Sequence, residues 1–406
     1  MASTFTTRCC IVGGGPAGMM LGYLLARAGV ETIVLEKHAD FFRDFRGDTV
    51  HPSTFNVMDE LGLVDGFVKL PHVKIQKMVG QFGDTSLQIA DLSRLHEKHP
   101  FIALIPQWDF LNFLRESGKR FPNLNVIMNA NVTDLIWSGD VVTGVKAMAP
   151  DGEVDIHADV TIGCDGRHSI VRERAKLDVT EIGAPMDVLW FRVSKGVESE
   201  NVFARMDAGK MMVTFDRGDY WQCAYVIPKG QFEAVKARGL DAFRNEVISM
   251  VPILKNTHTD VKSWEDVKLL TVAINRLKRW TRPGLLCIGD AAHAMSPIGG
   301  VGVNLAVQDA VATANILASK LARSGVLSEH ELDKVRQRRE WPVLFTQQLQ
   351  VVMQNNVISP VLKQGASYKI PLMIRIIDAV PLLQGFMARL MGFGVRPEHV
   401  HSPLAK

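Results

Sequence analysis

The stretch RCCIVGGGPAG at residues 8–18 decides the fold of this chain, because it predicts a buried strand, a glycine turn and the start of a helix. The helix continues to about residue 29, and residues 31–36 (ETIVLE) predict a second strand that ends in an acid. Gly13 makes the tight turn, Gly15 lets backbone amides approach a pyrophosphate, and Gly18 lets the helix pack closely on the strand. This order predicts a Rossmann-like dinucleotide-binding unit.

The helix start and Glu36 together indicate the kind of nucleotide. Unpaired amides and the helix dipole attract a pyrophosphate to the helix N-terminus. Glu36 lies eighteen residues beyond Gly18, where a carboxylate accepts hydrogen bonds from a ribose diol. An acid there favours FAD or NAD over NADP. The predicted contacts in this unit are Gly13, Gly15, Pro16, Ala17, Gly18 and Glu36.

The composition is that of an ordinary soluble globular protein. Of 406 residues, 47% are hydrophobic and 22% are charged, and the net charge of +3 is too small to indicate a nucleic-acid partner. The five cysteines form no CxxC pair, so we expect reduced, buried thiols and no metal site. Residues 1–7 lack the features of a signal peptide, and charged and polar side chains interrupt the apolar residues 370–395. We therefore expect a cytoplasmic protein without a transmembrane span.

The middle of the chain changes character and then returns to the first pattern. Residues 181–270 contain short, aromatic-rich strands joined by glycine or charged turns, which predicts an inserted antiparallel sheet. Residues 284–290 (GLLCIGD) again predict a buried strand, followed by a glycine-rich loop and a long helix of small residues. The tail from residue 346 is apolar and helical, with proline breaks.

Three motifs, taken in order, resemble those of the FAD-dependent aromatic hydroxylases of the p-hydroxybenzoate hydroxylase type. They are the GGGPAG turn at residues 13–18, the GCDG segment at residues 163–166 and the GDAAH segment at residues 289–293. The resemblance covers about residues 8–320. It implies that the first motif holds the ADP part of FAD, that Asp165 contributes to both FAD and NAD(P)H binding, and that Asp290 contacts the cofactor's ribityl or ribose hydroxyl groups. Gly289, which precedes Asp290, is also expected to bind the cofactor.

Two further side chains match family positions that line the cofactor, Arg46 and Gln107. By spacing alone, Arg46 either clamps phosphate oxygens or is a solvated arginine. Gln107 either contacts the cofactor or caps the helix that it opens. The resemblance favours the cofactor role for both.

A glycine-rich loop at residues 299–302 leads into a helix whose first amides belong to Gly302, Val303 and Asn304. Such a helix start stabilises negative charge on a reduced flavin. Pro297 matches the family proline whose backbone lies beside the flavin, and the family pattern makes His293 structural. No essential catalytic side chain is identified.

The expected fold is therefore α/β, with a Rossmann-like FAD-binding domain, an inserted antiparallel substrate sheet and C-terminal helices. We expect FAD-binding parts at residues 1–180 and 271–345, the first with residues 73–106 near the substrate domain. The substrate-binding sheet is expected at residues 181–270, and a helical segment at residues 346–406.

The expected activity is that of an FAD-dependent monooxygenase. NADH or NADPH reduces the flavin as a transient partner, and one oxygen atom of O₂ enters a phenol-like or polycyclic aromatic substrate through a flavin C4a-hydroperoxide. The substrate is expected on the inner face of the inserted sheet, although the pattern does not say which strand positions face inward. The candidates are Trp190, Arg192, Phe215, Gln222 and Tyr225.

Three alternatives remain open. A flavin halogenase carries Trp-x-Trp-x-Ile-Pro, whereas residues 223–228 read CAYVIP and lack both tryptophans. A reductase or dehydrogenase of an isoprenoid-type substrate uses the same cofactor fold. A non-catalytic, membrane-docked flavin protein follows if the apolar tail makes a peripheral membrane contact. The chain is expected to be a monomer or a homodimer.

Overall fold

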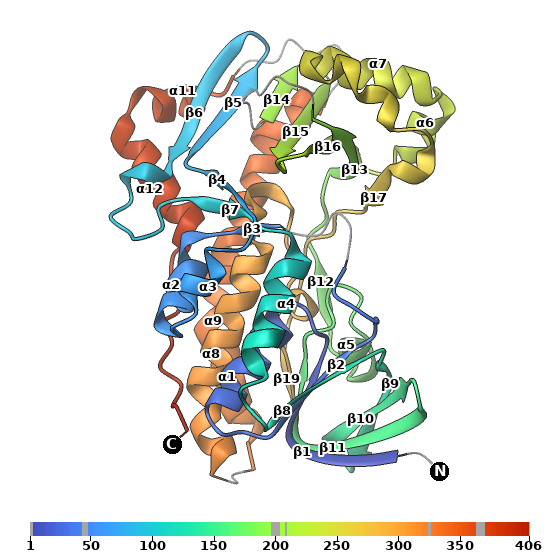
Figure 1. Ribbon diagram of the computed structural model, residues 1–406, viewed down its shortest axis with the longest axis vertical. Coiled ribbons are helices and arrows are strands. Elements are labelled where there is room, and N and C mark those ends of the chain that lie inside the picture. Colours follow the sequence, from blue (N-terminus) through green and yellow to red (C-terminus); the bar gives the residue numbers. More distant parts are fainter. Residues whose placement is uncertain are drawn as a thin grey trace.

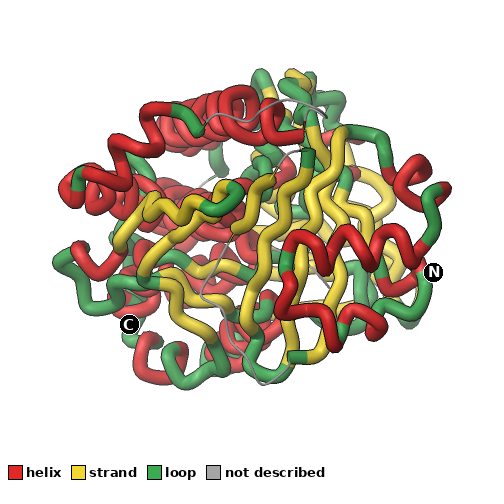
Figure 2. The backbone as a smooth tube through the Cα atoms, turned by 90° about the horizontal axis from the view of Figure 1, so that it is seen from above, coloured by secondary structure: helices red, strands yellow, loops and turns green. Residues whose placement is uncertain are grey.

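The computed structural model describes residues 3–42, 48–195, 204–207, 209–323, 326–362 and 370–405. A mostly parallel sheet forms the lower end of the molecule in Figure 1, and an antiparallel sheet forms the upper end. Long helices run between the two ends. Seen from above, the strands lie between two groups of helices (Figure 2).

The parallel sheet is built around the strand that carries the glycine turn. In spatial order its strands are β19 (Thr281–Arg282), β20 (Leu285–Cys287), β11 (Gly152–Gly163), β1 (Ser3–Val12), β2 (Thr32–Glu36) and β8 (Leu124–Met128). β1 pairs in parallel with both β11 and β2. The antiparallel strands β9 (Asn131–Ser138) and β10 (Val141–Ala149) extend from β11.

Two glycines let helix α1 (Pro16–Arg27) lie close to the sheet. A Cβ atom at Gly18 would lie 1.9 Å from the carbonyl oxygen of Gly13, and one at Gly22 would lie 2.7 Å from the side chain of Val34. α1 also packs against α8 (Gly302–Ala322) and α4 (Gln107–Gly118). The nearly all-buried α1 therefore forms the centre of the main hydrophobic core.

Among the described residues, the antiparallel sheet has seven strands. In order they are β17 (Lys268–Leu270), β13 (Met186–Ser194), β16 (Tyr220–Pro228), β15 (Lys210–Asp216), β14 (Ala204–Asp207), β5 (Lys77–Phe82) and β6 (Thr85–Asp91). Helices α6 (Phe232–Ala237) and α7 (Leu240–Met250) cover one face with their own apolar core. The other face is left to line a cavity.

Short elements connect the two ends of the molecule. A three-stranded sheet contains β3 (Thr49–Val50), β7 (Ile102–Leu104) and β4 (Val73–Ile75), and β12 (Val179–Glu181) pairs with β18 (Asn275–Leu277). Helices α2 (Pro52–Glu60), α3 (Val64–Phe67) and α5 (Ile170–Arg174) complete this part.

The C-terminal part is helical. It contains α9 (Glu329–Met353), a π-helical turn over Gln354–Ile358, α10 (Ser359–Leu362), α11 (Leu372–Ala379) and α12 (Pro381–Phe393). By length and composition one described helix, Ile298–Ala322, is apolar enough to cross a membrane, but 78% of its apolar window is buried in the protein. It is the core helix of this fold. The architecture confirms the predicted fold class: a Rossmann-like sheet, an antiparallel sheet and C-terminal helices.

Candidate active site

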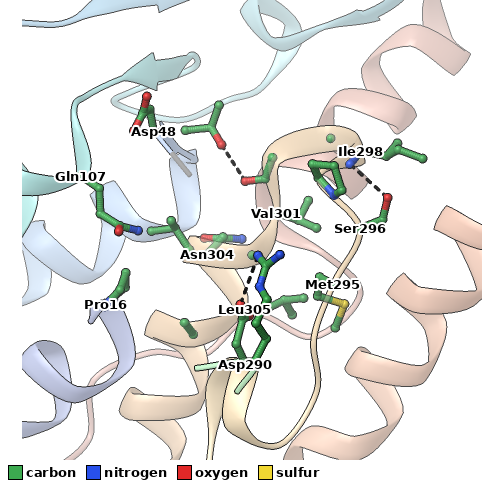
Figure 3. Close-up of a pocket in the computed structure, with 18 of the residues that line it drawn as sticks. Pro16, Asp48, Gln107, Asp290, Met295, Ser296, Ile298, Val301, Asn304 and Leu305 are labelled. Atoms are coloured by element: carbon green, nitrogen blue, oxygen red, sulfur yellow. Dashed lines mark hydrogen bonds and ion pairs between the residues drawn. The ribbon is translucent and has the colours of Figure 1, made fainter. Parts of the chain in front are cut away.

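One large cavity runs from the glycine turn after β1 to the uncovered face of the antiparallel sheet. Its volume is about 870 Å³. Segments from the parallel sheet, α8, α9, α12 and the antiparallel sheet all contribute to its wall. Figure 3 shows Pro16, Gln107, Asp290 and Asn304 around this space, although they come from four separate elements.

The glycine turn forms one end of the cavity. Gly13 has a φ of +106°, and a Cβ atom there would lie 2.5 Å from the carbonyl oxygen of Cys164, so only glycine fits. Gly15 has ordinary extended backbone angles and would allow a Cβ atom, which meets nothing within 4 Å. No side chain caps the N-terminus of α1. The open space at Gly15 and the uncapped amides fit a pyrophosphate.

Glu36 ends β2 beside this turn and is buried. Its Oε2 accepts a hydrogen bond from the backbone N–H of Gly14 at 3.0 Å, and its Oε1 accepts one from the N–H of His38 at 3.1 Å. The carboxylate therefore shapes the turn and also faces the cavity.

Two aspartates follow neighbouring parallel strands, β11 and β20. Asp165 accepts hydrogen bonds from the Ser169 hydroxyl at 2.5 Å and from the N–H of Val171 at 3.2 Å, so it anchors the start of α5. Burial raises the pKa of Asp165, although these hydrogen bonds act in the opposite direction. Asp290 is one-third exposed and lies 3.8 Å from the guanidinium of Arg167. Both aspartates line the cavity, at the strand ends where α/β sheets bind ligands.

The loop before α8 lies on the opposite wall from the glycine turn. Pro297 lines the cavity, and Gly299 and Gly300 have φ values of +77° and +62°. A Cβ atom at Gly302 would meet nothing within 4 Å, and no side chain caps α8. The start of α8 is therefore a second uncapped helix N-terminus that faces open space, which fits an electron-rich ring edge.

Hydrogen bonds hold this loop in place. Asn304 accepts from the hydroxyls of Ser53 and Thr54 at 2.5 and 2.9 Å, and Thr49 donates to the carbonyl oxygen of Gly300 at 2.7 Å. Figure 3 marks the bond from the Ile298 N–H to the Ser296 hydroxyl. These contacts tie the start of α8 to α2 and β3.

Gln107 opens α4 and lines the cavity. Ala17, Gly13, Gly15, Pro16, Gly302 and Val303 also line it, whereas Gly289 begins the turn that carries Asp290. Arg46, the predicted phosphate clamp, lies outside the described residues.

The structure separates the five substrate candidates. Trp190, Phe215 and Gln222 line the cavity, and the rings of Trp190 and Phe215 stack with centroids 5.8 Å apart. Tyr225 points to the other face, where its hydroxyl donates to Glu246 at 3.1 Å, and burial raises its pKa. Arg192 is exposed and lies beyond the cavity wall. Sequence alternation did not reveal which face α6 and α7 would cover.

Charged residues of the cavity wall that the sequence did not mark include Asp48, Arg167 and Arg217. Arg167 directly follows the GCDG segment at residues 163–166. Asp48 and Arg217 form an ion pair across 169 residues of sequence. No local pattern marks that pair.

His293 is a structural residue, as its family position implied. It is 1% exposed, and its Nε2 lies 2.6 Å from Oδ2 of Asp309. The same Oδ2 accepts from the Gly289 N–H at 3.0 Å, and Arg339 donates to Oδ1 at 2.9 Å. This buried network fixes the turn that presents Asp290.

All five cysteines are buried and free. Within the described ranges, no group of three or more His, Cys, Asp or Glu side chains is placed to hold a metal ion.

Comparisons with known proteins agree with this geometry. Residues 6–342 match the family model of the FAD binding domain. The chain is 31% identical over 356 residues to the 6-methylpretetramide 4-monooxygenase of Streptomyces rimosus, covering 87% of this chain and 85% of that relative.

Two solved structures share the fold. The anhydrotetracycline hydroxylase OxyS from Streptomyces rimosus superposes with a TM-score of 0.75 at 23% identity, covering 97% of this chain and 77% of that chain. The p-nitrophenol 4-monooxygenase PnpA from Pseudomonas putida superposes with a TM-score of 0.73 at 22% identity, covering 96% of both chains.

Proposed function

The chain belongs to the FAD binding domain family and is an FAD-dependent monooxygenase, and from this premise we propose that it hydroxylates a polycyclic aromatic substrate. NADH or NADPH serves as the transient reductant in this proposal. The observation that carries it is the continuity of the cavity, which joins the nucleotide-binding turn to the apolar face of the antiparallel sheet.

The bound cofactor, once reduced by a nicotinamide, supplies activated oxygen for transfer to the ring. The chain's own residues bind and orient the cofactor and the substrate, and they exclude water from the site. The turn at Gly13–Gly18 and Glu36 would hold the ADP part, and Asp290 would hold the hydroxyl groups. The amides at the start of α8 would stabilise negative charge on the reduced ring, and the backbone of Pro297 would lie beside it.

The lining of the substrate end supports a large, apolar ligand. Trp190 and Phe215 offer a stacked aromatic surface, and flexible methionine side chains surround it. These methionines are Met78, Met186, Met206, Met211, Met295, Met353, Met387 and Met391. Such a wall adapts to several ring systems and excludes water from the transferred oxygen. By their names, two of these relatives act on 6-methylpretetramide and on anhydrotetracycline, and we extend an aromatic polyketide-type substrate to this chain.

The deciding experiment measures NADH and NADPH oxidation by the FAD-bound protein under air. A panel of phenols, quinolones and polyketide-like aromatics is added, and hydrogen peroxide is followed in parallel. Stimulation by one compound with little peroxide, together with a product 16 mass units heavier, supports the proposal. Electron transfer to an alkene without O₂ uptake supports the reductase alternative instead, and halide incorporation supports the halogenase.

Glu36 gives a quantitative test of the cofactor site. We expect Glu36→Ala to weaken FAD binding by about 1 to 3 kcal/mol, the scale of hydrogen bonds to a charged group. The physical reason is the loss of a ribose acceptor and of the two bonds to the N–H groups of Gly14 and His38. Fluorescence titration of the apoprotein with FAD measures the effect. An unchanged dissociation constant would place the ribose contact elsewhere.

For the C-terminal helices we propose a peripheral contact with a lipid surface, alongside a cytoplasmic location. The outer sides of α11 and α12 expose Leu372, Met373, Ile376, Leu382 and Phe386, with Leu382 80% and Phe386 60% exposed. The inner side of α12 contributes Met387, Leu390 and Met391 to the cavity wall. An apolar substrate would therefore have a short path from a membrane to the site.

Replacing Leu382 and Phe386 together by serine is expected to lower the fraction of protein that sediments with phosphatidylcholine–phosphatidylglycerol vesicles at least threefold. Each side chain contributes about 1.5 to 3 kcal/mol when fully buried in an apolar phase. Val326→Ser, at a site that is 79% exposed elsewhere on the surface, is the matched control. Equal sedimentation of the wild type and the double variant would exclude the membrane contact.

A further inference from the structure

A buried ion pair stands in the wall of the cavity, at its substrate end. Asp48 precedes β3, and Arg217 lies in the turn between β15 and β16. Nη2 of Arg217 donates to Oδ2 of Asp48 at 2.5 Å, and the two side chains are only 5% and 7% exposed. Both residues line the cavity, and Figure 3 shows the position of Asp48. The pair therefore joins the cofactor-binding part of the chain to the antiparallel sheet.

The surroundings of the pair are apolar. Among the described lining residues between 181 and 270, Arg217 is the only charged side chain. Its Nε donates to Oε1 of Gln222 at 2.9 Å, while its Nη1 is buried and has no hydrogen-bond partner among the described residues. A buried donor without a partner destabilises the protein, and a ligand acceptor would recover that cost.

The pair itself carries no net charge, because one carboxylate faces one guanidinium. Tyr220 packs nearby, and burial raises its pKa, with opposing influences from Arg217 and Asp48. An additional anion at this place would leave an excess negative charge in an apolar chamber, which is costly. A neutral group that accepts one hydrogen bond and donates another would leave the balance intact.

We propose that Asp48 and Arg217 form a subsite for a neutral substrate group that carries an acceptor and a donor side by side. A carboxamide, an enolised β-diketone or a hydroxyl next to a ketone has this pattern. The carbonyl oxygen accepts from Arg217, and the N–H or O–H donates to Asp48. The subsite discriminates against carboxylates of the same shape. This inference rests on the proposed function, because it defines the substrate class of the same cavity.

The test compares two probes of nearly identical shape, 2-naphthamide and 2-naphthoate. Each is titrated into the FAD-bound protein, and the perturbation of the flavin absorbance spectrum gives its dissociation constant. The expected result for the wild type is at least tenfold tighter binding of the amide. Equal binding, or tighter binding of 2-naphthoate, overturns the proposal.

Asp48→Asn gives the sharper result, because it removes one negative charge and keeps the shape of the side chain. The expected outcome is that 2-naphthoate binds at least tenfold tighter than to the wild type, so that the preference disappears or reverses. Asp219→Asn makes the same change in net charge outside the cavity wall and is expected to keep the wild-type preference. An unchanged probe ratio in Asp48→Asn, or the same reversal in Asp219→Asn, contradicts the subsite.

If Asp48→Asn does not retain FAD, the double variant Asp48→Asn/Arg217→Gln replaces it, since this variant removes both charges of the pair. It is expected to bind both probes within threefold of each other, and a persisting tenfold preference contradicts the proposal. The FAD content of each preparation distinguishes a failure of the proposed function from a failure of the subsite. Wild-type protein that binds no FAD refutes the proposed function, whereas FAD-bound protein without probe preference refutes only the subsite.

Discussion

Replacing Asp309 by alanine is expected to lower the free energy of unfolding by about 3 to 5 kcal/mol, the scale on which a broken buried ion pair destabilises a protein. The side chains of Asp309 and Arg339 are both 0% exposed, and their contact is 2.9 Å. Without the carboxylate, the contacts of the Arg339 guanidinium that remain among the described residues are those to Glu398 and to the carbonyl oxygen of Arg396, both at 3.3 Å. Urea unfolding followed by circular dichroism, with FAD in excess, measures the change.

The same substitution should disturb the cofactor site. Asp309 accepts from the Gly289 N–H and holds His293, so it fixes the turn that carries Asp290. FAD should therefore dissociate at a lower urea concentration than in the wild type. Asp333→Ala is the matched control, because Asp333 pairs with Arg336 at the partly exposed surface of α9. A surface pair of this kind contributes about 0 to 1 kcal/mol. Equal effects of the two substitutions would mean that the buried network is not a stability determinant.

The network also has a defined pH dependence. Burial alone would raise the pKa of Asp309, but His293 and Arg339 outweigh burial and lower it below its ordinary value of 3.8. A carboxyl whose pKa is depressed by folding contributes stability above its unfolded value and loses that contribution as the pH falls. The stability difference between wild type and Asp309→Ala should therefore shrink as the pH falls below 3.8.

Gly15→Ala is expected to weaken FAD binding at least tenfold while leaving the stability of the cofactor-free protein unchanged. The backbone angles of Gly15, φ −74° and ψ −174°, suit any residue. An added Cβ atom would meet no protein atom within 4 Å, so nothing within the chain requires glycine there. The remaining reason is the close approach of a pyrophosphate, which the methyl group would block.

The measurements are an FAD titration of the apoprotein and urea unfolding of the same preparation. Gly385→Ala is the control, because Gly385 lies inside α12 and an added Cβ atom would make only ordinary contacts, 3.6 Å from Arg94. The control should keep wild-type FAD affinity and gain up to about 1 kcal/mol of stability from helix propensity. Wild-type FAD affinity in Gly15→Ala would mean that the pyrophosphate binds away from this turn.

The predicted elements with strong local signals occur close to the predicted positions. The helix that Gln107 was expected to open spans Gln107–Gly118, and α9 spans Glu329–Met353. The latter begins with Ser328 and Glu331 in a capping box, a signal contained within four residues. Hydrophobic periodicity and capping depend on residues a few positions apart, so both can be recognised in the sequence alone.

The substrate face was predicted only in part, for a physical reason. Alternation along a strand defines two faces, but it does not say which one a later segment will cover. In β16, Gln222 lines the cavity while Tyr225 packs against the core under α7. Helices α6 and α7, which follow β16 in sequence, cover the Tyr225 face and leave the Gln222 face to the cavity.

The sequence by itself determined the β1–α1–β2 unit and its glycine turn with Glu36, because these depend on residues within about thirty positions of one another. It also indicated the family, through three short motifs that occur in order along the chain. Only the tertiary structure decided the polar part of the substrate end. Asp48 and Arg217 meet because β3 and the β15–β16 turn converge on the cavity. Chain topology rather than local pattern brings such distant charges together, and their pairing in an apolar wall gives the cavity its proposed selectivity.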